Sequence, residues 1–331
     1  MTQPQFSLKS PYADLDGLEP HRGIWHSHLA TETPSPSEVR EICRAGGQDF
    51  VGVTDHDNRY LALPWSHEDW REAETEDFLV ILGFEASHPI GHVTCLGVTP
   101  EQVGVDAEAA GKNRFEDAGL DAGYEGMLAR AADAGAFVAL NHPHRWRGAG
   151  RELLAEPDFD RVHALEIFNG NQVGKATAQG YTADLLDECL SAGARLWAAA
   201  NPDCHSWDET RSDGPFNGFS MVFAAELSEA AILDSLKSGR FYASTGLEVQ
   251  TLALTDERLE VGAEGCERIS FIGAGGEVLE QVDADRASYQ FSGAETYVRA
   301  ELEGAAGSSV GPDGFPRMAW LQPVWVCDDA R

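Results

Sequence analysis

Short apolar runs recur through the first three quarters of the chain, and helix-like stretches separate several of them. Each run is apolar on both faces of an extended strand, which is typical of a strand buried on both sides. The runs lie at residues 50–54, 78–82, 93–97, 137–140, 164–168, 195–199 and 219–223. Strands that alternate with helices form parallel sheets, so the sequence predicts an α/β fold whose sheet, at this length, closes as a barrel.

Two of the helix-like stretches, one before the first run and one after the last, carry start and stop signals. Ser35 and Pro36 open a helical pattern over residues 37–44, which stops at a pair of glycines. A second pattern, over residues 228–236, stops near Gly239. Both signals support the alternation of strands and helices.

The pattern changes after Gly246, where helical periodicity ends. Apolar and polar residues alternate at 268–272, 297–302 and 320–326, with glycines between them, as in small antiparallel sheets. The stretches 101–120 and 303–317 are expected to be loops. We therefore divide the chain into a barrel at residues 1–246 and a small C-terminal antiparallel β domain at residues 247–331.

The charge of the chain excludes two classes of partner. Its 331 residues include 24 Lys and Arg against 55 Asp and Glu, a formal net charge of −31. Nucleic acid and anionic membrane bind clustered positive charge, so neither is an expected partner. No apolar stretch approaches the ~20 residues that span a bilayer, and the first residues do not resemble a secretory signal. We expect a cytoplasmic protein whose six cysteines, without a CxxC pair, stay reduced.

Histidines and acids gather just after the predicted strands. In a parallel barrel the carboxyl ends of all strands open on one face, so these side chains are expected to converge there. Imidazole with carboxylate is the ligand mixture of zinc, manganese and iron sites, and one carboxylate can bridge two cations. The set is His26, His28, Asp55, His56, Asp57, Glu85, His92, His142, Glu166, Asp203 and His205.

Each of these signals also has an ordinary structural explanation. A single His-x-His pair in a strand places both rings on one face without binding anything, and Asp-His pairs in turns are common surface residues. Their coincidence at several strand ends favours a metal site. The remaining histidines divide: His88 and His144 lie close to the cluster and stay open, whereas solvated or structural roles are expected for His21, His67 and His163.

Other catalytic chemistries lack their signatures. The sequence contains no GxSxG nucleophile motif, no P-loop and no GxGxxG after a strand. Water activated by a metal is therefore the expected mechanism. Some barrel hydrolases bridge two metals with a carboxylated lysine, but none of the four lysines ends a predicted strand, so Glu85 is the candidate bridging ligand.

The order of these motifs resembles that of the PHP (polymerase and histidinol phosphatase) metallohydrolases over residues 22–246. The segments at 166–170 and 227–246 and the chain's C-terminal motifs look further like its carbaryl-hydrolase-like (CehA/McbA) branch, which appends a small β domain. The resemblance implies a distorted (β/α)7 TIM-like barrel with two or three divalent ions (Mn, Zn or Fe). The motifs are His26-Ser-His28, Val53-Thr-Asp-His56-Asp57, Gly83-Phe-Glu85, Gly91-His92, Asn141-His142-Pro143 and Asp203-Cys-His205.

The resemblance also implies a division of ligands. One metal would be held by His26, His28, Glu85 and Asp203, a second by Glu85, His92 and His142, and a third by His56 and His205. The family's usual acid after the His-x-His pair is missing here, so Glu32 is the candidate substitute. Asp55 and Glu166 are expected to orient ligating histidines.

Three functions remain open. The first is a phosphoesterase that uses a metal-bridging hydroxide on a small phosphate mono- or diester, with Glu85, His142 and His205 as catalytic residues and Arg145 or Arg147 gripping the phosphate. The two arginines could instead serve solubility. The second is a carboxylic or carbamate ester hydrolase with an apolar pocket, for which Trp146, Phe168 and Trp207 are candidates if they are not core residues. The third is a metal-binding module without turnover.

Overall fold

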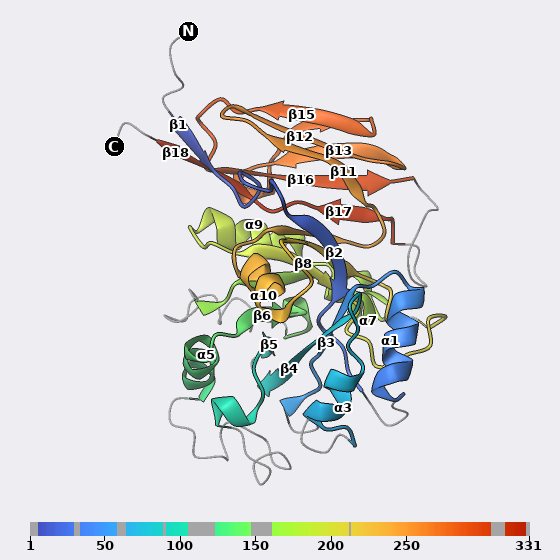
Figure 1. Ribbon diagram of the computed structural model, residues 1–331. Coiled ribbons are helices and arrows are strands. Elements are labelled where there is room, and N and C mark those ends of the chain that lie inside the picture. Colours follow the sequence, from blue (N-terminus) through green and yellow to red (C-terminus); the bar gives the residue numbers. More distant parts are fainter. Residues whose placement is uncertain are drawn as a thin grey trace.

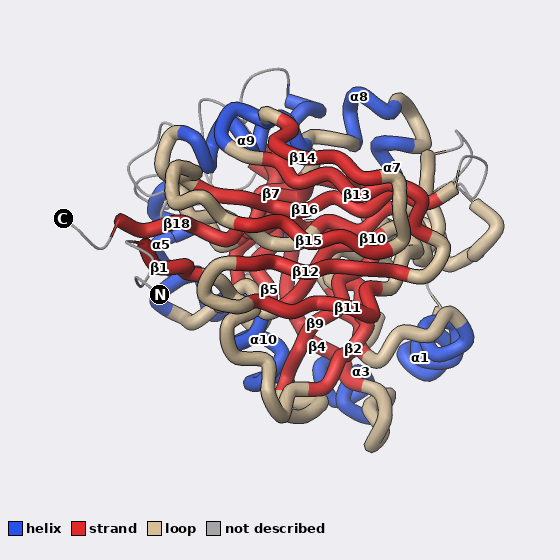
Figure 2. Tube along the Cα trace, turned by 90° about the horizontal axis from the view of Figure 1, so that it is seen from above, coloured by secondary structure: helices blue, strands red, loops and turns tan. Residues whose placement is uncertain are grey.

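The computed structural model describes residues 6–29, 34–57, 64–88, 91–104, 123–146, 161–211, 213–305 and 315–328. The fold is mixed α/β, with a 15-stranded sheet, a separate 3-stranded sheet and a small number of helices. Strands of the last third of the chain form the upper part of Figure 1, and the helices gather around the strands of the lower part. Seen from above, strands fill the centre of the molecule and the helices lie at its margin (Figure 2).

The strands before residue 246 include all seven apolar runs. They are β1 (Phe6–Lys9), β2 (Glu19–Ile24), β3 (Phe50–Val53), β4 (Leu79–His88), β5 (Gly91–Leu96), β6 (Phe137–Asn141), β7 (Ala164–Asn169), β8 (Trp197–Asn201), β9 (Phe219–Ala224) and β10 (Phe241–Ser244). The later strands are β11 (Val249–Leu254), β12 (Arg258–Ala263), β13 (Cys266–Ile272), β14 (Val278–Val282), β15 (Arg286–Gln290), β16 (Tyr297–Gly304), β17 (Met318–Trp320) and β18 (Val324–Asp328).

The helices are short. They are α1 (Pro36–Ala45), α3 (His67–Glu72), α5 (Gly123–Asp133), α7 (Gly170–Val173), α8 (Thr177–Gly180), α9 (Ala183–Ser191) and α10 (Glu229–Lys237), with 3-10 turns η1 (Glu101–Val103), η3 (Pro143–Trp146) and η5 (Ala274–Gly276). The start signal of α1 is a capping box: the Ser35 hydroxyl accepts the Glu38 N–H, and the Glu38 carboxylate accepts the Ser35 N–H. Both helices expected from the sequence are present, while most of the two expected loops lies outside the described residues.

The prediction of a wholly parallel sheet is wrong at two strands. Strands β2, β3 and β4 are parallel to one another, as are β6, β7 and β8, but β5 runs antiparallel to both of its neighbours. Only two residues join β4 to β5, and a parallel connection needs a dozen or more, so this pair has to be a hairpin. Strand β9 is likewise antiparallel to β2.

The segments that follow β2 and β8 meet at a narrow contact, which we call the seam. Strand β8 is an end of the hydrogen-bonded path, so the ladder of the described strands does not close, and a closed barrel stays a prediction. One parallel bridge joins Ser27 to Cys204, and the His28 N–H donates to the Cys204 carbonyl at 2.8 Å. The Trp25 N–H donates to the Asn201 side chain at 3.0 Å. The segment after β2 and the segment after β8 are thus held together where the sheet curves round.

The last third of the chain is joined closely to the first part. Strand β17 pairs with β10, and the N-terminal strand β1 pairs with β18, near the other chain end. The apolar run at 320–326 is two strands, interrupted at residues 321–323. The sheet β11–β12–β15 packs on β13 and β16 around a core that includes Leu259, Phe271 and Leu302. The division at residue 246 stays a prediction.

Glycine allows β3 to lie close to the end of β2. A Cβ atom on Gly52 of β3 would lie 2.7 Å from the Cα atom of Trp25, which directly follows β2. All six cysteines are free thiols, and five are buried.

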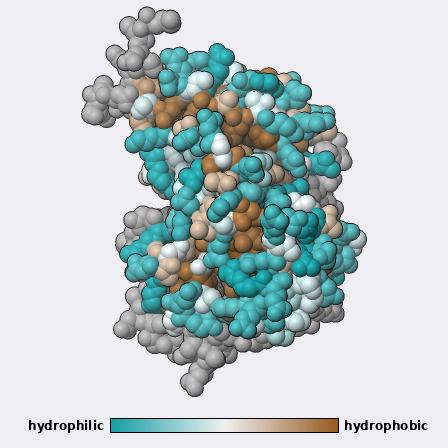
Figure 3. Space-filling view, in the orientation of Figure 1, coloured by the Kyte–Doolittle hydropathy of each residue, from teal (hydrophilic) through white to brown (hydrophobic). Residues whose placement is uncertain are grey.

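No helix among the described residues is long and apolar enough to cross a membrane. The face shown in Figure 3 is mainly hydrophilic, with hydrophobic residues in a few patches.

Candidate metal centre

Eight predicted ligands come together at the carboxyl ends of the parallel strands. Five strands of common direction deliver most of them, and β5, which runs the other way, delivers His92 near its start. The eight are His26 and His28 after β2, His56 after β3, Glu85 in β4, His92 in β5, His142 after β6, and Asp203 and His205 after β8. Five of the side chains are exposed by 2% or less, whereas those of His92, His56 and His205 keep 10%, 16% and 31% exposed.

Glu85 occupies the centre of the group. Its Oε1 atom lies 2.9 Å from His92 Nδ1, 3.2 Å from His142 Nε2 and 3.3 Å from His26 Nε2. Its Oε2 atom lies 2.7 Å from His56 Nδ1 and 3.6 Å from His28 Nε2. A carboxylate with different imidazoles at its two oxygens has the arrangement of a ligand shared by two cations.

Asp203 provides a second carboxylate at the seam. Its Oδ1 atom lies 3.1 Å from His28 Nε2, 3.3 Å from His26 Nε2 and 3.4 Å from His205 Nδ1. The His205 Nδ1 atom also lies 3.0 Å from the Asp203 carbonyl oxygen, which can accept its proton. In that tautomer the other nitrogen of His205 is left for a ligand.

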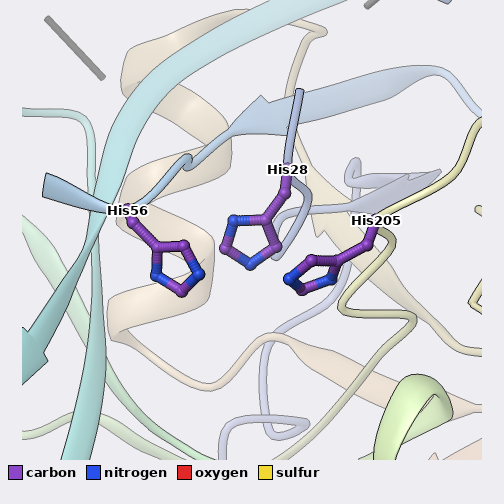
Figure 4. A group of neighbouring side chains, drawn as sticks. All are labelled: His28, His56 and His205. Carbon is purple, nitrogen blue, oxygen red and sulfur yellow. The ribbon is translucent and has the colours of Figure 1, made fainter. Parts of the chain in front are cut away.

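Three histidine rings lie side by side at the more open side of the site (Figure 4). The ring of His28 lies between those of His56 and His205, with centroids 4.4 and 4.2 Å away. One nitrogen from each of the three can lie within 4.8 Å of the others. The resemblance implies His56 and His205 for a third metal, with Glu32 as the candidate substitute for the missing acid, and the structure places His28 next to that pair. Glu32, the expected third partner, lies outside the described residues.

Backbone strain marks two of these residues. Within the described ranges, His142 (φ 31°) and Asp203 (φ 49°) are the two non-glycine residues with positive φ. Left-handed backbone is unfavourable for residues with a Cβ atom and persists where the surroundings enforce it. His142 directly follows β6, and Asp203 is two residues after the end of β8, so both strained turns lie at strand ends whose side chains face the centre of the group.

The carboxylates are held in their charged form. Burial by itself would raise the pKa of Glu85, but His92, His26 and other imidazoles offset it and hold that pKa well below its usual range. Burial opposes ionisation of Asp203 in the same way, and His26 and His28 bring its pKa well below the ordinary value. Both acids are therefore available as anionic ligands.

The histidines of the site differ in the direction in which their surroundings shift the pKa. Burial would lower the pKa of His26, yet Glu166, Asp203 and Glu85 raise it well above its usual value. Burial and the nearby His28 lower the pKa of His205 to about 4, so this ring is neutral at pH 7. A neutral imidazole is the form that binds a metal.

Glu166 contacts two of the ligands as expected of an orienting residue, and Asp55 lies near a third. Glu166 Oε1 lies 2.9 Å from His26 Nδ1, and its other oxygen accepts the His142 N–H at 2.9 Å. With Nδ1 donating to Glu166, the Nε2 atom of His26 faces the two acidic ligands. Asp55 accepts the Leu29 N–H at 2.8 Å and lies 3.6 Å from His28 Nδ1.

Several polar residues at the site were not expected. The Asn141 amide donates to Glu85 Oε1 at 2.9 Å, and the Ser87 hydroxyl lies 2.7 Å from His56 Nδ1. Asn171 and Gln172 of α7 approach Asp203. Ser87 could have been found, because it is two residues beyond Glu85 in the same strand and so points to the same face.

The other candidate residues lie away from the centre of the site or outside the residues that the structure describes. The Arg145 and Trp146 side chains and all of Arg147 lie outside the described residues, as does the side chain of His88. His144 Nε2 lies 3.6 Å from Asp184. Phe168 is a core residue that packs on Phe315 and Trp320, whereas the Trp207 indole donates to the His28 carbonyl at 3.1 Å.

The residues present fit divalent cations. Both ring nitrogens of His28 are buried and lie near carboxylates, Nε2 at 3.1 Å from Asp203 and Nδ1 at 3.6 Å from Asp55, yet neither contact within the described part of the chain has the geometry of a hydrogen bond. Buried polar atoms normally have a partner, so a further group is expected here. Four sets of three ligand atoms lie close enough to share an ion: His28, His56 and His205; His26, His28 and Glu85; His26, His142 and Asp203; and His56, Glu85 and His92.

One solved structure resembles this fold over its whole length. It is a two-domain protein from Bacteroides vulgatus ATCC 8482 that contains a predicted PHP-like metal-dependent phosphoesterase. The TM-score is 0.51 at 17% identity, and the alignment covers 96% of this chain and 98% of that one. The two proteins share a fold.

Other comparisons give less. An amidohydrolase from Chromobacterium violaceum, with bound sulfate and no metal, aligns with 54% of this chain and 85% of its own, at 16% identity and a TM-score of 0.31. No protein-family model matches the chain, and no curated protein matches it.

Proposed function

We propose that this chain is a PHP-like metal-dependent hydrolase that acts on a small phosphate mono- or diester. The observation that carries the proposal is the buried Glu85 carboxylate, which has five imidazoles from four separate segments of the chain within 3.6 Å of its two oxygens. Imidazole and carboxylate together are a donor set for zinc, manganese and iron. The shared fold with a protein described as containing a PHP-like phosphoesterase supports the same reading.

The proposed ligands divide among two or three cations. His26, His28, Glu85 and Asp203 would hold one ion, and Glu85 with His92 and His142 a second. His56 and His205 would hold a third, next to His28. Cations held there would supply Lewis acidity and a water of lowered pKa. The protein would contribute fixed tautomers through Glu166 and Asp203, and burial that excludes bulk water.

The exposed fractions of the ligands suggest where substrate enters. The side chains of His26, His28 and His142 are exposed by 1% or less, whereas 31% of the His205 side chain and 16% of the His56 side chain are exposed. A substrate would therefore reach the centre past His205 and His56. Arg145, three residues after His142 in η3, is the proposed contact for a phosphate oxygen.

Elemental analysis with a hydrolysis screen tests the proposal. We expect at least two divalent ions per chain after dialysis, and metal-dependent hydrolysis of p-nitrophenyl phosphate or bis-p-nitrophenyl phosphate. Hydrolysis of p-nitrophenyl acetate alone would favour the carboxylic or carbamate ester hydrolase. Bound metal without any turnover would favour a binding module, and a chain that binds no metal would reject the proposal.

The Arg145 contact is tested separately. Arg145→Ala should lower kcat/KM for a phosphate ester by about ten- to a hundredfold, because a charge-assisted hydrogen bond contributes ~1.5 to 3 kcal/mol. Metal content should be unchanged, and so should activity on a neutral ester. Arg147→Ala provides the neighbouring comparison. Full activity of both variants toward a phosphodiester would remove the anion contact from the proposal.

A further inference from the structure

Two amide side chains of α7 approach the Oδ2 atom of Asp203, whereas the neighbouring histidines contact its Oδ1 atom. The three histidine contacts of Asp203 are made with Oδ1, at 3.1 to 3.4 Å. The Nδ2 atom of Asn171 donates to Oδ2 at 3.2 Å, and the Nε2 atom of Gln172 lies 3.5 Å from the same oxygen. Both amides are at least nine-tenths buried. The two oxygens of this carboxylate therefore have different partners.

That difference matters for a metal ligand. A carboxylate can bind a cation through one oxygen or through both, and the second mode takes up an additional ligand position. A catalytic site needs a position that the protein does not occupy. An N–H donor on Oδ2 competes with the two-oxygen mode, since it uses the lone pairs that would turn to the cation.

We infer that Asn171 is a positioning residue that keeps Asp203 a one-oxygen ligand and so keeps a ligand position open for the substrate. The inference rests on the proposed metal centre. It adds to that centre a residue outside the set of expected ligands, acting through Asp203.

The main chain around Asn171 makes this effect separable from folding. The Asn171 N–H donates to the Pro202 carbonyl at 3.0 Å, and the Gly174 N–H donates to the Gly170 carbonyl at 3.0 Å. These bonds hold α7 and the turn at Asp203 without the side chain of Asn171. Leucine has the same number and branching of side-chain heavy atoms as asparagine and no donor, so Asn171→Leu removes the contact and leaves the main-chain bonds.

Cobalt(II) bound to the apoprotein provides the measurement. In Asn171→Leu we expect Co²⁺ to bind at the wild-type stoichiometry, with weaker visible absorption bands, because these bands lose intensity as the number of ligands rises. On the ester that the wild type hydrolyses best, kcat/KM should fall about ten- to a hundredfold, because the second carboxylate oxygen would take the position left for the substrate. Asn171→Ala is the second variant, in case the leucine does not fold. Gln179→Leu, which replaces an exposed amide in the neighbouring α8, should match the wild type in both measurements.

The possible results separate this inference from the proposed function. Wild-type Co²⁺ bands and kcat/KM in folded Asn171→Leu or Asn171→Ala would overturn the inference. The inference would also be overturned if these variants bound less Co²⁺ and their metal-free forms unfolded at a lower temperature than metal-free wild type, because the two losses together indicate a purely structural residue. A wild-type chain that binds no Co²⁺ would instead reject the metal centre itself.

Discussion

Glu85 is the residue on which the proposed centre depends most. Replacing it with glutamine keeps the size of the side chain but removes the negative charge that faces His26, His92 and His142 through one oxygen and two further rings through the other. We expect Glu85→Gln to lose most of its bound metal, measured by elemental analysis. Hydrolysis should fall more than about a hundredfold, because a shared ligand weakens two ions at once.

The matched control is Glu41→Gln, on the exposed face of α1. It removes the same charge from the surface and should change neither metal content nor hydrolysis. Undiminished metal in Glu85→Gln would contradict the central place given to this carboxylate.

His163 shows how one buried ring gives stability a pH dependence. Burial and the charge of Lys237 lower its pKa to about 4, and its Nδ1 accepts the Val138 N–H at 3.1 Å. In the unfolded chain a histidine has a pKa near ~6.5, so the unfolded state binds the extra proton first. The stabilisation is complete above about pH 6.5 and is lost as the pH falls toward 4.

Asn is the test substitution because its side-chain oxygen can still accept a hydrogen bond. Between pH 7 and pH 4.5 the free energy of unfolding should fall by ~1 to 2 kcal/mol less in His163→Asn than in the wild type, as partial exposure moderates the effect. Urea unfolding at several pH values measures the difference. Parallel pH profiles would show that His163 does not titrate as described.

At the scale of elements, the sequence predicted the positions of strands better than their directions. Buried strands are visible as apolar runs, and ligands at strand ends follow because parallel strands share an edge. The reversal of β5 was within reach, because two residues cannot make a parallel connection. The place of His28 between His56 and His205 was not, since it depends on the seam between β2 and β8. Local pattern carries no information on contacts across such a distance in the chain.

Gln322 is another contact that no local pattern indicates. Its side-chain amide accepts the Ala198 N–H at 2.7 Å and donates to the Ala198 carbonyl at 2.9 Å, across 124 residues. Since β8 is an end strand, this amide takes the place of a neighbouring strand at Ala198. Gln322→Ala would leave two buried backbone groups without partners.

We therefore expect Gln322→Ala to lower the free energy of unfolding by ~2 to 4 kcal/mol in urea, since each unsatisfied buried group costs ~1 to 3 kcal/mol. Gln281→Ala, at an exposed amide of β14, should stay within ~0.5 kcal/mol of the wild type. A loss of the same small size at Gln322 would mean that water satisfies Ala198 equally well.

At the scale of the whole molecule, the two parts of the chain share one core. Trp320, Met318 and Trp325, from the last strands, belong to the same buried cluster as Phe168 and Leu165 of β7. The buried Arg299 of β16 forms an ion pair with Asp187 of α9 at 2.6 Å, which adds a polar contact between the parts. Elements that share a core and buried ion pairs unfold together.

Ending the chain after Gly246 tests this directly. Residues 1–246 would lose β17 from the edge of β10, Gln322 from Ala198 and Trp320 from Phe168, which exposes strand edges and apolar side chains together. We expect the shortened chain to aggregate or to lack a cooperative thermal transition by circular dichroism. Removing only residues 329–331 should leave a single transition at the wild-type temperature. A soluble 1–246 fragment with a sharp transition would instead establish the first part as an independent domain, with the later strands attached to it.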